Sequence, residues 1–79
     1  MKYLLAFGST YKALKAEKTL KEADIEFKLL TAPKPLSAYC DLVIAIDEEI
    51  HAECLELLKR FGAGVKSTFK KEGDDYVKV

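Results

Sequence analysis

Two uninterrupted apolar runs constrain the fold of this chain more than any other feature. The first, Tyr3–Phe7, ends at Gly8, and the second, Leu42–Ile46, lies between Asp41 and Asp47 and is rich in β-branched residues. Short apolar runs closed by turn or acidic residues are typical of strands that are buried in the centre of a sheet. The sequence therefore predicts two central strands.

A helix is expected after each of these strands. The segment 11–23 is rich in Ala, Leu, Lys and Glu, and the Ser9–Thr10 pair before it supplies a hydroxyl to cap its first turn. The segment 48–61 follows Asp47, which we expect to cap it, and stops at Gly62, a residue that tolerates the left-handed conformation. Apolar residues recur every three or four positions in both segments, which predicts one buried stripe on each helix. The stripes are Ala13, Ala16, Leu20 and Ala23, and then Ile50, Cys54, Leu57, Leu58 and Phe61.

Further strands are indicated between and after the helices. Segment 25–30 alternates well enough for a half-buried strand, whereas the two prolines of segment 32–40 cannot donate to a ladder and make it a loop. Segment 65–70 alternates again, and residues 72–75 form a turn before a last short strand over 76–79. The predicted order of elements is therefore strand, helix, strand, strand, helix, strand, followed by a short additional strand.

This order predicts an α+β fold of the ferredoxin-like βαββαβ type, an antiparallel sheet with both helices on one face and a short extra C-terminal strand. At 79 residues the chain has material for one core, so we expect a single domain over residues 1–79. The topology places the Gly8–Thr10 loop and the loop 33–40 at the same end of the sheet, with Asp47 at the opposite end.

Composition narrows the class of partner. Lys and Arg number 13 and Asp and Glu number 13, and this balance argues against nucleic acid or an anionic membrane surface as a partner. The apolar start turns polar at Gly8, too soon for a signal peptide or a membrane span, so we expect a cytoplasmic protein. Two cysteines at wide spacing are not a typical disulfide framework, and reduced thiols are expected.

Cys40 is the first candidate for chemistry, because it follows the proline loop at the end of the sheet where the first helix exposes its free amides. Helix N-termini and nearby cations favour a thiolate, the form that accepts a sulfur atom, and Lys34 is the nearest cation in the loop. The adjacent carboxylate of Asp41 opposes the anion. The alternative interpretation is that Cys40 is a small, semi-buried apolar residue at the start of a strand.

Three other features invite a functional reading. Gly8, Ser9 and Thr10 form a strand-to-helix turn whose amides suit an anion, but a single glycine is also typical of an ordinary turn and cap. Cys54 lies on the apolar stripe of the second helix and is read as core. His51 is three residues before Cys54, a spacing seen among metal ligands, yet two ligands do not make a site, so we expect a solvated His51 and no metal.

The chain resembles the DUF3343 family of selenium/sulfur carrier-like proteins. The resemblance rests on Phe7-Gly8-Ser9-Thr10 leading into Ala13–Glu17 and Leu20, and more specifically on Pro33–Cys40 before an apolar strand. In that family a proline and a basic residue, then Ile or Leu, Ser and Cys precede the strand, so Cys40 matches the family cysteine and Lys34 its basic position. The family cysteine is usually followed by Gly, whereas Asp41 follows here, a departure that bears on how closely the backbone approaches at that point.

The resemblance implies a sulfur or selenium carrier that holds a persulfide or selenopersulfide on Cys40. A cysteine desulfurase-like donor would load it and an acceptor protein would unload it, with no cofactor. Lys34 and the amides after Gly8 would stabilise the anionic sulfur, and Ser37 and Thr10 would donate hydrogen bonds to it.

Two alternatives stay open at the level of sequence. One is a small interaction or regulatory module that docks a partner on the open face or an edge of the sheet, with Cys40 incidental. The other, a thiol oxidoreductase, lacks a Cys-x-x-Cys pair. Sulfur versus selenium and the oligomeric state are not indicated by any residue pattern.

Overall fold

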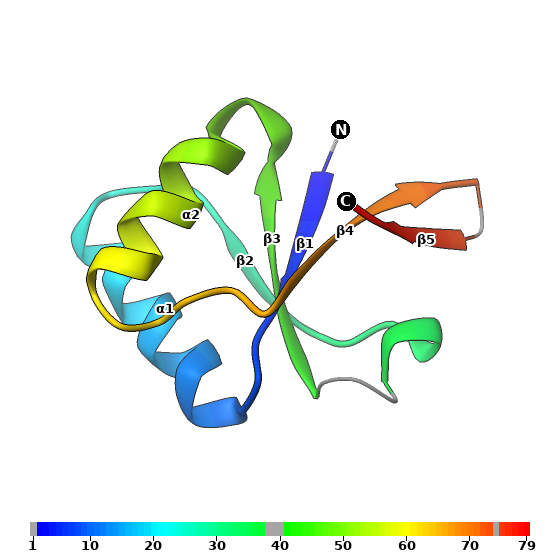
Figure 1. Cartoon of the computed structure of the whole chain (residues 1–79), viewed down its shortest axis with the longest axis horizontal. Coiled ribbons are helices and arrows are strands. Elements are labelled where there is room, and N and C mark those ends of the chain that lie inside the picture. The colour runs from blue at the N-terminus through cyan, green and yellow to red at the C-terminus, as the bar shows by residue number, and fades with distance from the viewer. Residues whose placement is uncertain (1, 38–40, 74) are drawn as a thin grey trace.

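The computed structural model describes residues 2–37, 41–73 and 75–79 of the chain. Two α-helices, two short 3₁₀ turns and a five-stranded sheet make up this part of it (Figure 1). In chain order these are β1 Lys2–Ala6, α1 Thr10–Glu22, β2 Lys28–Thr31, η1 Lys34–Leu36, β3 Leu42–Asp47, η2 Glu48–Ile50, α2 His51–Arg60, β4 Ser67–Glu72 and β5 Asp75–Lys78.

The sheet has the strand order β2-β3-β1-β4-β5, and every neighbouring pair is antiparallel. Its first four strands follow the ferredoxin-like arrangement, in which β1 and β3 are central and each helix links two strands that are not neighbours. The β4–β5 hairpin adds the fifth strand beyond β4. The α+β fold class predicted from the sequence is therefore confirmed, including the extra C-terminal strand.

Both faces of the central strands are buried, which explains why their sequences are apolar at every position. In β1, Leu5 packs into the cluster under the helices, whereas Leu4 and Ala6 belong to a second cluster on the other face. The same alternation in β3 sends Ile44 toward the helices and Val43 to the opposite side. Figure 1 shows both helices on one side of the sheet and η1 on the other.

The first helix begins as its sequence predicts and buries three of its four predicted stripe residues, whereas Ala23 at its end is exposed. Phe61, predicted for the stripe of the second helix, is exposed as well. Ser9 is the N-cap, and its side-chain oxygen accepts a hydrogen bond from the Lys12 amide at 3.2 Å. The stripe residues Ala13 and Ala16 are buried, and their small side chains let the helix approach the sheet closely. The stop of the second helix is also confirmed, since Gly62 has φ of 78°.

The start of the second helix differs from the prediction. Asp47 makes no side-chain cap; its carboxylate lies 3.4 Å from the Lys2 ammonium across the β1–β3 pair. The chain therefore enters the helix through the 3₁₀ turn η2 and becomes α-helical only at His51. The expected cap was wrong because a cross-strand cation competes for the same carboxylate.

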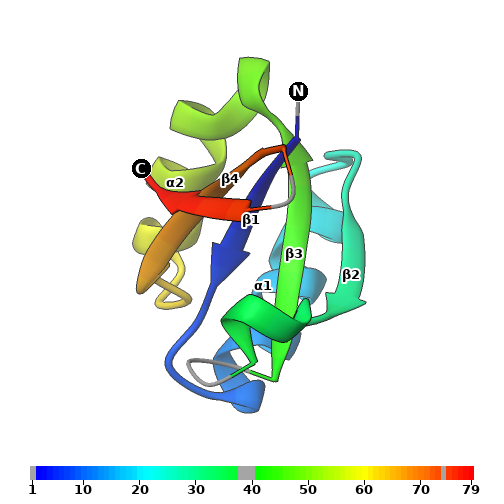
Figure 2. The same ribbon diagram turned by 90° about the vertical axis from the view of Figure 1, so that its right-hand side faces the viewer.

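Two connections also differ from the expected boundaries. Strand β2 begins at Lys28, where pairing with β3 starts, so residues 25–27 run beside the core without joining the ladder. Segment 32–40, expected to be loop, contains η1, whose Leu36 is only 2% exposed on the sheet face opposite the helices (Figure 2). That face is therefore not open at its centre, because this chain covers it.

Candidate functional site

The strand register brings three chain segments to one end of the sheet. Ala6, the last residue of β1, pairs with Val43, and Thr31, the last residue of β2, pairs with Leu42. At the other end Lys2 pairs with Asp47. The β1–α1 turn and the β2–β3 connection thus lie at the same end, as the sequence predicts.

Cys40 lies outside the described residues, together with Ala38 and Tyr39. The nearest described residue after it is Asp41, which is exposed and whose carbonyl accepts a hydrogen bond from the Ala32 amide at 2.9 Å. This bond ties the chain after Cys40 to the end of β2. The chemical role of Cys40 stays a prediction.

Lys34 and Ser37 belong to the η1 turn on the near side of Cys40. The Ser37 hydroxyl donates to the Lys34 carbonyl at 2.8 Å, so its hydrogen is already engaged within the turn. The Lys34 side chain is exposed and has no carboxylate partner in the described part of the chain. The turn therefore presents the Lys34 ammonium to solvent, while the Ser37 hydroxyl donates to a carbonyl of the turn itself.

The β1–α1 turn supplies backbone amides. The Ser9 carbonyl accepts from Ala13, and its hydroxyl accepts from Lys12, so those amides are satisfied. The amides of Thr10 and Tyr11 have no acceptor among residues 2–37, 41–73 and 75–79, as expected for the first turn of a helix. These amides and the positive end of the helix dipole thus lie at the end of the sheet where β3 begins.

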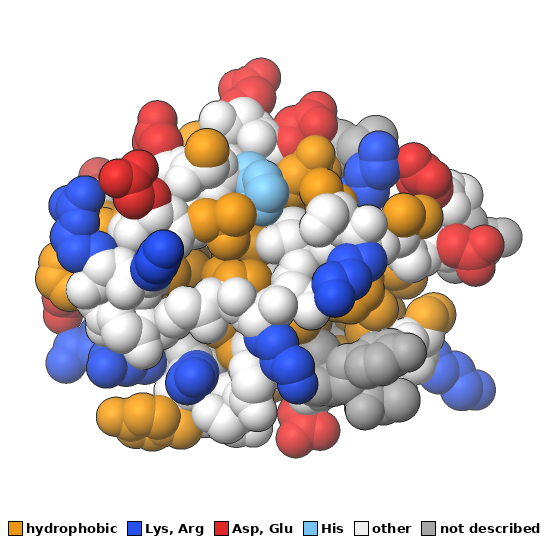
Figure 3. All heavy atoms as spheres, in the orientation of Figure 1, with side chains coloured by type: hydrophobic (Ala, Val, Ile, Leu, Met, Phe, Trp, Pro, Cys, Tyr) orange, Lys and Arg blue, Asp and Glu red, His pale blue; other side chains and the backbone are white. Residues whose placement is uncertain are grey.

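The surface charge is uneven along the same axis. In Figure 3 the acidic side chains lie mostly along the upper rim, whereas Lys and Arg side chains gather over the middle and lower part of the face. The lower part is where α1 begins and β3 starts in the matching ribbon view. A neutral chain thus presents mainly cationic side chains at the end of the sheet where β3 begins, although an acidic side chain also lies at the lower edge of this view (Figure 3).

Cys54 is confirmed as a core residue. It lies on the face of α2 that packs against the sheet, and its side chain is fully buried in the cluster between the helices and the sheet. Burial raises the pKa of the Cys54 thiol above its ordinary value, and the negative charge of Glu53 raises it further. A thiol in this environment is a poor nucleophile.

His51 is not the solvated residue that its helical position predicts. It is half-buried, its ring stands edge-on to the Tyr3 ring at 4.6 Å between centroids, and its Nε2 lies 3.5 Å from the Thr68 hydroxyl. No local sequence pattern indicates this contact, because it depends on the position of β4 beside β1. Within the described residues no group of three His, Cys, Asp or Glu side chains is placed to hold a metal.

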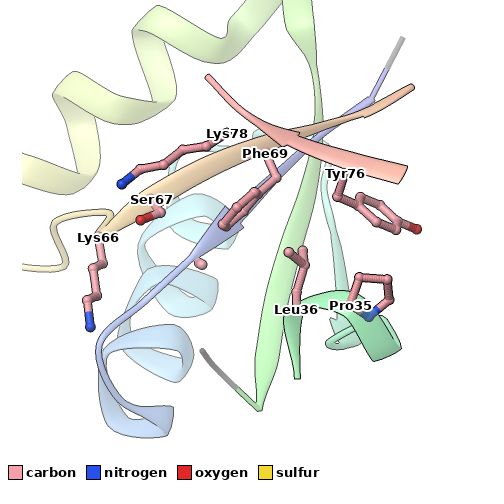
Figure 4. A pocket seen from close by; sticks show the side chains of 8 residues that line it. Pro35, Leu36, Lys66, Ser67, Phe69, Tyr76 and Lys78 are labelled. Atoms are coloured by element: carbon pink, nitrogen blue, oxygen red, sulfur yellow. The ribbon is translucent and has the colours of Figure 1, made fainter. Parts of the chain in front are cut away.

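A groove on the sheet face opposite the helices was missed from the sequence (Figure 4). It has a volume of about 420 Å³ and lies between η1 and the β4–β5 hairpin. We call it the η1 groove. The alternation of segment 65–70 signals a shared face for Ser67 and Phe69, but nothing local indicates that η1 returns over that face. Its lining is Ala6, Pro35, Leu36, Lys66, Ser67, Phe69, Tyr76 and Lys78.

Comparison with known proteins gives one family match. A family model described as "Putative Se/S carrier protein-like" matches residues 2–70. The match runs from β1 into β4 and includes Cys40, whereas β5 lies outside it. No curated protein and no solved structure matches the chain. No helix within the described residues is long and apolar enough to cross a bilayer.

Proposed function

Because this chain belongs to the Se/S carrier protein-like family, we propose that it carries sulfur or selenium as a persulfide or selenopersulfide on Cys40. A cysteine desulfurase-like protein is the donor and a second protein is the acceptor. The observation that carries the proposal is the contrast between the only two cysteines: Cys54 is fully buried with a raised pKa, which leaves Cys40, in a connecting segment within the family match, as the carrier thiol.

The relay consists of two exchange steps. In loading, the Cys40 thiolate attacks the outer sulfur of a persulfide on the donor; the donor's sulfur–sulfur bond breaks and the donor thiolate leaves. In unloading, an acceptor thiolate attacks the outer sulfur on Cys40, and the Cys40 thiolate is released. The moved atom keeps its oxidation state in both steps, so no separate oxidant or reductant is required. A selenium atom follows the same course.

The surroundings of Cys40 supply support for an anionic sulfur. The exposed Lys34 ammonium belongs to the same connection, and the amides of Thr10 and Tyr11, which have no acceptor among the described residues, lie at the same end of the sheet. Two features work against it. Asp41 adds a carboxylate next to the thiol, and Ser37 must release the Lys34 carbonyl before it can donate to sulfur.

Intact-mass spectrometry tests the proposal directly. We expect wild-type protein to gain the mass of one sulfur atom after incubation with a cysteine desulfurase and L-cysteine, and to lose it on treatment with a thiol reductant. Cys54→Ala is the matched control and should load like wild type, whereas Cys40→Ser should not load. A wild type that never gains sulfur, or a Cys40→Ser variant that gains it equally, contradicts the proposal.

A further inference from the structure

The η1 groove has the composition of a ligand site that the carrier proposal does not use. We propose that it binds a small anionic molecule with an apolar or aromatic tail. Its volume of about 420 Å³ lies in the range of small-molecule sites in proteins. The inference stands apart from the chemistry of Cys40.

The floor of the groove is apolar and already ordered by packing. Phe69 and Leu36 belong to the second core cluster, with 9% and 2% of their surfaces exposed, and Tyr76 packs against that cluster. In Figure 4 the Phe69 ring faces Leu36 across the groove, with Tyr76 and Pro35 farther along the same side. A preformed apolar floor of this kind binds an apolar tail without first having to reorganise.

The lysines of the groove lie on the side opposite Tyr76. In Figure 4 the side chains of Lys66, Ser67 and Lys78 lie on one side, and Pro35 and Tyr76 lie on the other. The ammonium ends of both lysines extend outward, so the lysines belong to the rim of the groove. Within the described residues the lining includes two lysines and no acidic side chain, and neither lysine has a carboxylate partner there. Lys70, on β4, is instead paired with Glu72 at 3.1 Å. The groove therefore separates charge from apolar surface, as an amphipathic anion requires.

The closed end of the groove favours a small molecule over a through-running peptide. Strand β5 contacts η1, so the groove is bounded at the end where Tyr76 and Pro35 lie in Figure 4. An extended segment of a partner protein needs two open ends, whereas a compact ligand needs only one. An anionic head at the lysines places the tail toward the closed end.

A titration followed by amide NMR tests the site, with phenylbutyrate as the anionic probe and phenylbutyramide as its neutral counterpart. We expect shift changes confined to the groove residues, among them Ser67, Phe69 and Tyr76. At low salt we expect the carboxylate to bind about threefold more tightly than the amide for each lysine engaged. Lys66→Ala and Lys78→Ala should each reduce this preference, whereas Lys12→Ala, an exposed lysine on α1, should leave it unchanged.

Tyr76→Ala tests the apolar end, and we expect it to weaken both probes equally. Cys40→Ser should bind both probes like wild type, so loss of sulfur loading and loss of ligand binding are separate outcomes. Equal affinity for the acid and the amide overturns the proposed role of the lysines. An absence of shifts, or shifts centred on the exposed residues Tyr11, Leu14 and Phe61, overturns the site itself.

Discussion

The two faces of the sheet are covered by different kinds of structure. On one face α1 and α2 bury large aliphatic and aromatic side chains that are almost fully excluded from water, among them Leu5, Phe7 and Leu20. On the other face a single 3₁₀ turn and a hairpin cover a smaller cluster, in which Leu36 is the one residue that η1 contributes. The helix face therefore contributes most of the stability of the domain, whereas the opposite face can bind a ligand or rearrange at a lower cost in free energy.

A deletion in the helix-side core should have the largest effect. Leu20 is fully buried in the last turn of α1, and we expect Leu20→Ala to lower the free energy of unfolding by about 3 kcal/mol because a cavity remains. Leu14→Ala on the same helix is the matched control, since Leu14 is 47% exposed, and should cost under about 1 kcal/mol. Urea denaturation measures both. Similar losses for the two variants contradict the assignment of the core.

The equivalent deletion on the opposite face should cost less. We expect Leu36→Ala to lower the free energy of unfolding by about 2 kcal/mol, because η1 can settle into the space that is left. Amide exchange should quicken at the Ala32 and Leu36 amides while α1 and α2 keep their protection. A loss equal to that of Leu20→Ala, with exchange faster throughout the chain, breaks the contrast between the faces.

Alkaline pH should act through the buried cysteine of the helix face. Burial raises the pKa of Cys54 above its ordinary value of 9.0, so the unfolded chain releases this proton at lower pH than the folded chain does. The stability contributed by the neutral thiol is complete below pH 9.0 and is lost as pH rises above it. We expect the stability of wild type to fall, relative to Cys54→Ala, by about 1 kcal/mol per pH unit there. A constant difference between the two proteins contradicts the burial of this thiol.

The same burial separates the two thiols in alkylation. We expect iodoacetamide to modify one thiol of the folded chain, and Cys40→Ser to remove that modification whereas Cys54→Ala does not. If Cys40 is electrostatically favoured as a thiolate, its alkylation rate should also reach its plateau at a lower pH than the alkylation rate of an ordinary cysteine does. Mass spectrometry of the quenched protein reads out both results.

The smallest changes in stability are expected from substitutions at the starts of the two helices. Ser9→Ala removes the hydroxyl that caps α1 and should cost about 1 kcal/mol. Asp47→Ala removes only a surface ion pair with Lys2, since Asp47 caps nothing, and should cost about 0.3 kcal/mol. Thermal unfolding at low and high salt distinguishes them, because only the Asp47 effect is screened. A larger loss at Asp47 than at Ser9 reverses this assignment.

Local signals predicted the elements that depend on local forces. The two apolar runs, the Ser9 cap, the Gly62 stop and the burial of Cys54 follow from residue periodicity and turn chemistry, and they gave the correct fold class. Features set by distant partners could not be read in this way. Asp47 pairs with Lys2 across the sheet, and His51 contacts Tyr3 and Thr68 from two other strands.

In the candidate site, too, some features follow from the sequence and others depend on distant partners. Strand order sufficed to place the Gly8–Thr10 turn and the β2–β3 connection at one end of the sheet. The orientation of Ser37 toward the Lys34 carbonyl, and the return of Leu36 over the sheet, depend on packing that no short sequence window contains. Cys40 itself lies outside the described residues, so the proposal that it is the carrier thiol rests on the family match and on the burial of Cys54.

The hydrogen bond from the Ala32 amide to the Asp41 carbonyl pins both ends of the β2–β3 connection at one point. A loop closed in this way has already lost its end-to-end freedom, so lengthening or shortening it changes the closure entropy only slightly. The exposed positions of the connection, such as Lys34 and Ser37, can therefore vary while the domain folds as before, provided that Leu36 is kept in the second core cluster.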